Sequence, residues 1–214
     1  MDYKKLTEAH KLFYEGEYRA FNYDGYMGCK DCKSWMDPDL PSGEVRKLFN
    51  FIKSWDRFFR GDLETFREIN RAVYSTLQEL KNERIEDTNF TEELKIKVRD
   101  VFDKVANCTL IDRYESTDAS KILHTILPNF FVMWDDDIKE GVMQGRAMGA
   151  AYAFYFLPKM QLELREAIKT CMEERKLNRT DAIKFICETC DGKTLAKLAD
   201  EYNYMKYTKK HPSL

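Results

Sequence analysis

Apolar side chains recur at three- and four-residue steps along nearly the whole chain, and this spacing limits the possible folds more than any other feature. That spacing gathers them on one face of an α-helix. Only five Pro and nine Gly occur among 214 residues, which fits helices joined by short connections. The sequence therefore predicts an all-α protein, a compact multi-helix globular fold of eight or nine helices. The stretch after Ser42 is typical of the pattern, with Val45, Leu48, Phe49, Ile52, Trp55, Phe58 and Phe59.

Residues that cap helices divide this pattern into segments. Ser42, Asp62 and Thr91 each stand just before a helical run, and their side chains can accept from the first free N–H groups. They predict helices over 42–60, 63–84 and 92–106, with Gly61 ending the first. Asn178 or Thr180 is expected to cap a later helix in the same way.

Two regions depart from this regular series. Residues 15–41 contain three Gly and two Pro and are predicted to be an irregular loop, although alternating Tyr, Phe and Gly leave a β-hairpin open. Residues 129–134 are apolar and predicted to be buried and irregular. A long helix is then expected to begin at residues 135–137 and to end near Leu157.

The chain is expected to form a single helical unit over residues 1–214, with a subdivision near 86–89 left open. It has no signal-type apolar core at its start and no uncharged apolar run of about 18 residues, so we expect a soluble, cytoplasmic protein without a membrane partner. The net charge is −2, which lacks the basic excess usual in nucleic-acid binders. A nucleic-acid site would need a local basic face.

Two Cys-x-x-Cys pairs are the first feature that could carry chemistry. Cys29 with Cys32, and Cys187 with Cys190, have the spacing that lets two sulfurs of one turn reach a single metal. Together they predict a zinc ion or an iron–sulfur cluster that joins the N-terminal loop to the C-terminal region. The alternative is that the pairs belong to small apolar helix faces and bind no metal.

The second feature is a Lys–His–Trp–Asp stretch in the middle of the chain. Lys121 and His124 precede Pro128, and Trp134 precedes the three carboxylates Asp135 to Asp137. Asp135 or Asp136 is expected to be a helix N-cap, because carboxylates at a helix start meet unpaired N–H groups. The functional interpretation pairs the Lys121 amine with the Asp135 carboxylate.

The order of these residues, over about Leu110 to Val142, resembles the core of the helix-hairpin-helix DNA glycosylases. In that superfamily a hairpin leads into a helix that carries a Lys, and an apolar segment presents a catalytic Asp at a helix start. The resemblance implies that Lys121 is the Schiff-base nucleophile of bifunctional members and that Asp135 stabilises the developing sugar cation. The glycine-rich hairpin of the family is absent here, and the interval from Lys to Asp is shorter.

Three further residues are candidates for ligand binding. His124 is either a ligand or base, or a hydrogen-bonded core residue. Gly141, Gly145 and Gly149 recur every four residues, which predicts close helix packing or, alternatively, room for a ligand. Gln144 and Arg146 lie beside this stripe, and Arg146 could contact an anion.

These features lead to three functional hypotheses. The leading one is a nucleic-acid-associated protein with a divergent glycosylase-like core, which uses Lys121 and Asp135. The second is a non-catalytic interaction module held together by metal at the four Cys. The third is a small-ligand-binding helical protein centred on the glycine stripe. The sequence leaves open whether the chain is an enzyme.

Overall fold

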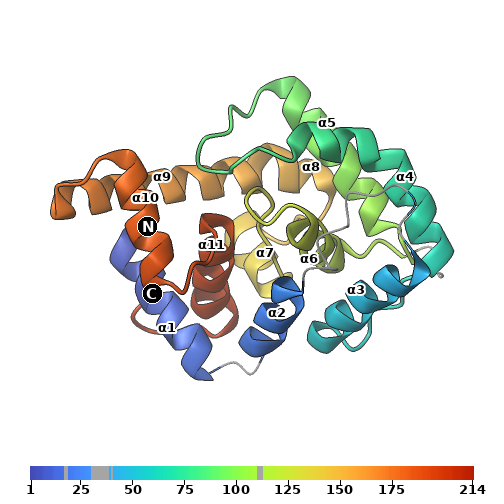
Figure 1. Cartoon of the computed structure of the whole chain (residues 1–214), viewed down its shortest axis with the longest axis horizontal. Coiled ribbons are helices and arrows are strands. Elements are labelled where there is room, and N and C mark those ends of the chain that lie inside the picture. The colour runs from blue at the N-terminus through green and yellow to red at the C-terminus, as the bar shows by residue number, and fades with distance from the viewer. Residues whose placement is uncertain (17–18, 30–38, 40, 110–112) are drawn as a thin grey trace.

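The computed structural model describes residues 1–16, 19–29, 39, 41–109 and 113–214 (Figure 1). These residues contain no strand beyond one isolated bridge between Gly61 and Thr109, so the all-α prediction is confirmed. The helices are α1 (Tyr3–Gly16), α2 (Arg19–Gly28), α3 (Ser42–Trp55), α4 (Leu63–Leu80), α5 (Glu92–Ala106), α6 (Ser116–Ile126), α7 (Asp136–Met143), α8 (Gly149–Ala151), α9 (Leu157–Arg175), α10 (Arg179–Thr189) and α11 (Leu195–Asn203).

Two π-helical turns extend this series. Residues Tyr152–Phe156 join α8 to α9 without a break, and residues Tyr204–Thr208 continue α11. The described residues therefore hold ten continuous helices, one more than the upper predicted number. None of the described helices is both long and apolar enough to cross a membrane.

The C-terminal helix α11 lies in the middle of the molecule (Figure 1). It packs against α1 and α9, and α6 packs against α5. Every residue of α11 is buried, although the helix carries one Lys, one Asp and one Glu. Those charges must therefore find partners inside the protein, because an unpaired buried charge is costly.

The predicted N-caps at Asp62, Thr91 and Asn178 are confirmed. Each side chain accepts a hydrogen bond from the backbone N–H three residues later, at 2.8, 3.2 and 2.9 Å respectively. The cap predicted at Ser42 is wrong, because Pro41 occupies that position and Ser42 is the first helical residue. This helix also ends at Trp55, earlier than predicted, since Asp56 turns into extended backbone.

Two larger predictions are corrected by the structure. The loop predicted over residues 15–41 contains helix α2, with Ala20 and Tyr23 buried against the core. The helix predicted from Asp135 to Leu157 is interrupted, because α7 ends at Met143 and the next two residues, Gln144 and Gly145, have positive φ angles of 56° and 74°. The glycine stripe is thus spread over two helices and a turn.

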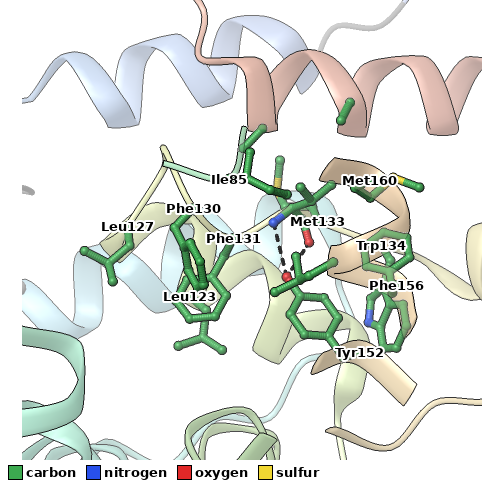
Figure 2. Packing of buried hydrophobic residues seen from close by; sticks show 14 of the residues in the cluster. Ile85, Leu123, Leu127, Phe130, Phe131, Met133, Trp134, Tyr152, Phe156 and Met160 are labelled. Atoms are coloured by element: carbon green, nitrogen blue, oxygen red, sulfur yellow. Dashed lines mark hydrogen bonds between the residues drawn. The ribbon is translucent and has the colours of Figure 1, made fainter. Parts of the chain in front are cut away.

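The segment between α6 and α7 is irregular, as predicted, and it is buried from Phe130 to Trp134, whereas Asn129 is exposed (Figure 2). The Tyr152 hydroxyl donates to the Val132 carbonyl at 2.6 Å and accepts from the Val132 N–H at 3.1 Å. Ser120 Oγ accepts from the Trp134 N–H at 3.1 Å. These bonds replace the missing helical ones, and they set where the chain presents Trp134 and the following Asp135.

Candidate functional site

Lys121 and Asp135 line the same cavity, which has a volume of about 280 Å³. This is near the lower end of the range of about 300–1,000 Å³ for small-molecule pockets. The lining comes from α1, the end of α3, α6, the segment between α6 and α7, the start of α7 and the C-terminal helix. Its residues are Phe13, Trp55, Asp56, Thr117, Lys121, Met133, Trp134, Asp135, Asp136, Asp137, Ile138, Asp200 and Tyr204.

Lys121 enters the cavity from α6 and is only 8% exposed. Its Nζ lies 3.2 Å from Oδ1 of Asp118, one turn earlier on the same helix. Asp118 is 1% exposed, and burial raises the pKa of its carboxyl to about 6. Among the described residues, its Oδ2 has no hydrogen-bond partner. The Lys121 amine thus lies between a buried carboxyl group and the cavity.

Asp135 both caps a helix and lines the cavity. Its Oδ1 accepts from the backbone N–H of Ile138 at 2.8 Å, and its Oδ2 accepts from the Thr208 hydroxyl at 2.6 Å. The predicted N-cap is therefore confirmed. Because one carboxylate oxygen is held by the start of α7 and the other by Thr208 near the C-terminus, the orientation of this carboxylate in the cavity is fixed.

A second carboxylate, Asp200 of α11, reaches the cavity from the C-terminal part of the chain. Its Oδ2 accepts from Lys197 Nζ at 2.6 Å. Burial raises the pKa of Asp200 to about 6, and the nearby Lys197 opposes this rise. Sequence reasoning missed this residue. The available signal was a Lys and an Asp three residues apart in a final helix that is otherwise rich in apolar residues.

Lys197 is fully buried beside the cavity. Burial lowers the pKa of its amine, but Asp200 and Glu201 more than offset this effect, so the pKa is raised overall. The ammonium also lies over the rings of Phe13 and Tyr23, 4.5 and 4.8 Å from the ring centres. A cation over an aromatic face is stabilised by the ring quadrupole. Lys197 therefore remains charged inside the protein.

The balance of charge around the cavity is negative. Five aspartates line it, against one lysine, Lys121. One of the five, Asp136, is paired with Lys139 at 2.6 Å, and this hydrogen bond holds the pKa of Asp136 below its usual value. Together with the aromatic rings of the wall, this charge suits a planar group or one that carries positive charge.

His124 lies in the core and does not line the cavity. Its Nδ1 lies 2.6 Å from the Phe131 carbonyl oxygen, and its Nε2 lies 2.8 Å from the Tyr23 hydroxyl. A neutral ring satisfies both partners, with Nδ1–H donating and Nε2 accepting. Burial accordingly lowers the pKa of His124 to about 3. The arrangement fits the core interpretation, in which His124 holds α2 and the segment after α6 together.

Arg146 and Gln144 line a separate, shallow surface hollow, and both are exposed. The rest of this hollow is mostly apolar and includes Tyr155 and Leu162. Glycine packing is close at two positions of the stripe. A Cβ added to Gly141 would meet Tyr207 at 2.2 Å, and one added to Gly149 would meet Asp103 at 2.6 Å.

The four predicted metal ligands are only partly described. Cys32 lies outside the described residues. Across the described ranges, no three or more His, Cys, Asp and Glu side chains are gathered so as to hold a metal ion, and this includes Cys29, Cys187 and Cys190. Burial raises the pKa of the Cys187 thiol to about 11 and that of Cys190 to about 12. Both thiols are therefore protonated near neutral pH.

No family model, no curated protein and no solved structure matches this chain.

Proposed function

We propose that this chain hydrolyses an N-glycosidic bond in a nucleic acid, with a divergent helix-hairpin-helix glycosylase-like core. The observation that carries the proposal is that Lys121 and Asp135 line one aromatic-walled cavity. The resemblance pairs the same two residues as amine and carboxylate. Enzymes that act on a base extrude it from the stack into a pocket that holds it between aromatic and apolar side chains. Trp55, Trp134 and Tyr204 supply such walls.

Asp135 is suited to stabilise the transition state of this reaction. When a glycosidic bond breaks, positive charge develops on the sugar. A carboxylate that is already oriented lowers the barrier, because it does not reorganise during the reaction. The bonds from the Ile138 N–H and the Thr208 hydroxyl supply that orientation.

Lys121 is the candidate nucleophile. Attack by its amine on the anomeric carbon would form a carbon–nitrogen bond while the base leaves with the electron pair of the glycosidic bond. The amine must first lose a proton, and the Asp118 carboxyl group lies 3.2 Å away, within reach to accept it. If Lys121 does not attack, water attacks the anomeric carbon instead, and the products are a free base and an abasic site.

A hollow next to the cavity carries two arginines that could contact a nucleic-acid substrate. It contains Arg60, Arg113 and Glu115, and it shares Asp56 and Asp136 with the cavity lining. Phe58 also lines this hollow and is largely exposed, with the Arg57 guanidinium 4.7 Å from its ring centre. Arginines that flank a base pocket can contact the phosphates on either side of an extruded nucleotide. Three carboxylates line the same hollow, and Glu115 lies 3.1 Å from the Arg113 guanidinium, so these arginines do not make it a basic face.

Borohydride trapping and base release test the proposal together. The purified chain is incubated with oligonucleotides that carry either an abasic site or a modified base. We expect release of a base, and Asp135→Asn should reduce it by about 10²-fold or more, the usual size of a lost electrostatic contact in a transition state. If Lys121 is the nucleophile, borohydride traps a covalent adduct that Lys121→Ala abolishes. Absence of base release, adduct and salt-sensitive binding would refute the proposal.

A second candidate function follows from the charge of the cavity. Five aspartates and four aromatic rings, against one lysine, also suit a free organic cation. Quenching of tryptophan fluorescence by 1-methyladenosine, compared with neutral adenosine, measures this preference. Tight binding of the cation by a chain that has no activity on oligonucleotides would favour the second candidate over the first.

A further inference from the structure

The cavity contains two carboxylates whose surroundings differ. Asp135 accepts hydrogen bonds at both oxygens, from the Ile138 N–H and the Thr208 hydroxyl. Asp200 accepts only at Oδ2, from Lys197, and within the described part of the chain its Oδ1 makes no hydrogen bond. Asp135 adds to the upward shift of the Asp200 pKa, so the two carboxylates lie close enough to repel each other.

Asp200 is also held firmly in place. It is 8% exposed, and its partner Lys197 is buried between aromatic rings and also lies 3.5 Å from Glu201 Oε1. Glu201 in turn lies 2.8 Å from Nδ1 of His10, on helix α1. A side chain in such a network cannot swing away from the cavity without leaving Lys197 underpaired. Asp200 is thus a fixed acidic group in the cavity, whereas Asp136 and Asp137, which also line it, are exposed to solvent.

Two carboxylates in one site can divide the roles of acid and base when their environments differ. With a pKa raised to about 6, Asp200 carries a proton in part of the population near neutral pH. A nucleobase that leaves from a sugar is a poor leaving group unless a proton reaches one of its ring nitrogens. The cavity therefore offers both a stabilising carboxylate and a proton source.

We propose that Asp200 is the general acid of this site and that Lys197 is its positioning residue. This inference rests on the proposed function. The Asp200 carboxyl gives its proton to a ring nitrogen of the base, the carbon–nitrogen bond breaks, and the electron pair leaves with the base. Water adds its hydroxyl to the anomeric carbon and its remaining proton returns to the Asp200 carboxylate. The sum is one water consumed, one neutral base released and an unchanged enzyme.

The titration of Asp200 depends on several charged neighbours. Lys197 and Glu201 flank it on α11, and Asp135 faces it from the start of α7. Lys121 and the rim carboxylates Asp56, Asp136 and Asp137 share the cavity. His10 acts through Glu201. If the acid form of Asp200 is required, release of a neutral base declines as pH rises through about 6.

The test compares two oligonucleotides that differ in the charge of the leaving base. One carries hypoxanthine, which is neutral, and the other 7-methylguanine, which is already a cation and needs no proton. For Asp200→Asn we expect hypoxanthine release to fall by about 10²–10⁴-fold, the usual contribution of a general acid, while 7-methylguanine release changes by less than about tenfold. The decline with pH should disappear from the remaining hypoxanthine activity. Asp100→Asn, an exposed site on α5, is the control for the loss of one carboxylate.

The outcomes separate this inference from the proposed function. If the wild-type chain releases neither base, the proposed function fails and this inference fails with it. Two results would keep the proposed function but show that Asp200 is not the acid. Either Asp200→Asn slows the release of both bases equally, or hypoxanthine release by this variant still falls as pH rises through about 6. Release of the cationic base alone also overturns the inference, because no proton donor is then in use. If only hypoxanthine is released, loss of the alkaline decline in Asp200→Asn supports the inference and its persistence refutes it.

Lys197→Gln tests the positioning role. Lys197 lowers the pKa of Asp200, so its removal should move the alkaline decline of hypoxanthine release to higher pH. If Lys197 has a purely structural role, Lys197→Gln should release hypoxanthine more slowly, but the release should fall at the same pH as in the wild-type chain. Circular dichroism establishes whether this buried variant folds. If it does not, Asp200→Glu takes its place: the carboxyl group should restore a pH-dependent decline that Asp200→Asn lacks, and absence of that decline counts against the proposal.

Discussion

Replacing Tyr152 with Phe isolates the hydrogen bonds that hold the segment leading to the candidate site. The Tyr152 hydroxyl is the partner of both the Val132 N–H and the Val132 carbonyl, and all three groups are buried (Figure 2). Phe keeps the ring that packs edge-on against Trp134, with ring centres 4.9 Å apart. The substitution therefore removes the two bonds while leaving most of the apolar contact intact.

The expected cost follows from the two groups left behind. Each buried backbone group that loses its partner costs about 1–3 kcal/mol. Two such groups predict that Tyr152→Phe lowers the free energy of unfolding by about 2–5 kcal/mol, allowing for partial relaxation. Tyr155→Phe, in the same π-helical turn, provides a matched control. Its side chain is 58% exposed, and its free energy of unfolding should change by less than about 0.5 kcal/mol.

Urea denaturation followed by tryptophan fluorescence and circular dichroism measures both variants. The slope of unfolding free energy against urea should remain unchanged, so that the midpoint alone reports the loss of stability. Equal midpoints for Tyr152→Phe and Tyr155→Phe would refute the reasoning. They would mean that Val132 finds other partners and that Tyr152 does not hold the segment before Asp135.

Two further predictions concern ionisation and packing. In histidine ¹⁵N spectra, His124 should stay neutral with its proton on Nδ1 down to pH 5. Burial lowers the pKa of His10, but Glu201 and Asp191 more than offset this effect, so His10 should titrate at a pKa above the usual 6.5. The contribution of His10 to folding stability is therefore present below pH 6.5 and is lost as pH rises through the pKa of the folded state. The contribution of His124 is present above pH 6.5 and is lost as pH falls from 6.5 to about 3. A His124 that titrates near 6.5 would contradict this prediction. Gly61→Ala would place a Cβ 2.4 Å from the Phe59 ring and should cost about 1–3 kcal/mol. Gly25→Ala, with nothing within 4 Å, should stabilise helix α2 by about 0.5–1 kcal/mol, and equal effects in urea denaturation would show the packing argument to be wrong.

The metal hypothesis remains a prediction about four cysteines, one of which lies outside the described residues. It requires stoichiometric zinc or iron in the purified chain. Elemental analysis of the purified protein is the direct measurement. Loss of metal and of stability together in Cys187→Ser would support a metal that contributes to folding.

The sequence by itself determined the helical class and most helix starts. The caps at Asp62, Thr91, Asp135 and Asn178 could be predicted because each one is a bond between a side chain and a backbone N–H three residues away. Such bonds depend on local geometry alone. The buried segment before Asp135 could also be predicted, since its apolar residues are consecutive and bounded by Pro128.

The tertiary structure alone decided where α7 ends and which residues share the cavity. The helix predicted through Leu157 stops at Met143, and no periodic pattern indicates the left-handed backbone of the following Gln144. Phe13, Trp55 and Asp200 meet Asp135 only because α1, α3 and α11 pack around one centre, and contacts between such distant segments leave no local trace. Lys197 and Asp200 look like surface charges in the sequence. Inside the fold Lys197 lies 2.6 Å from Asp200 and 3.5 Å from Glu201, and this pairing is what allows a helix with charged residues to be buried.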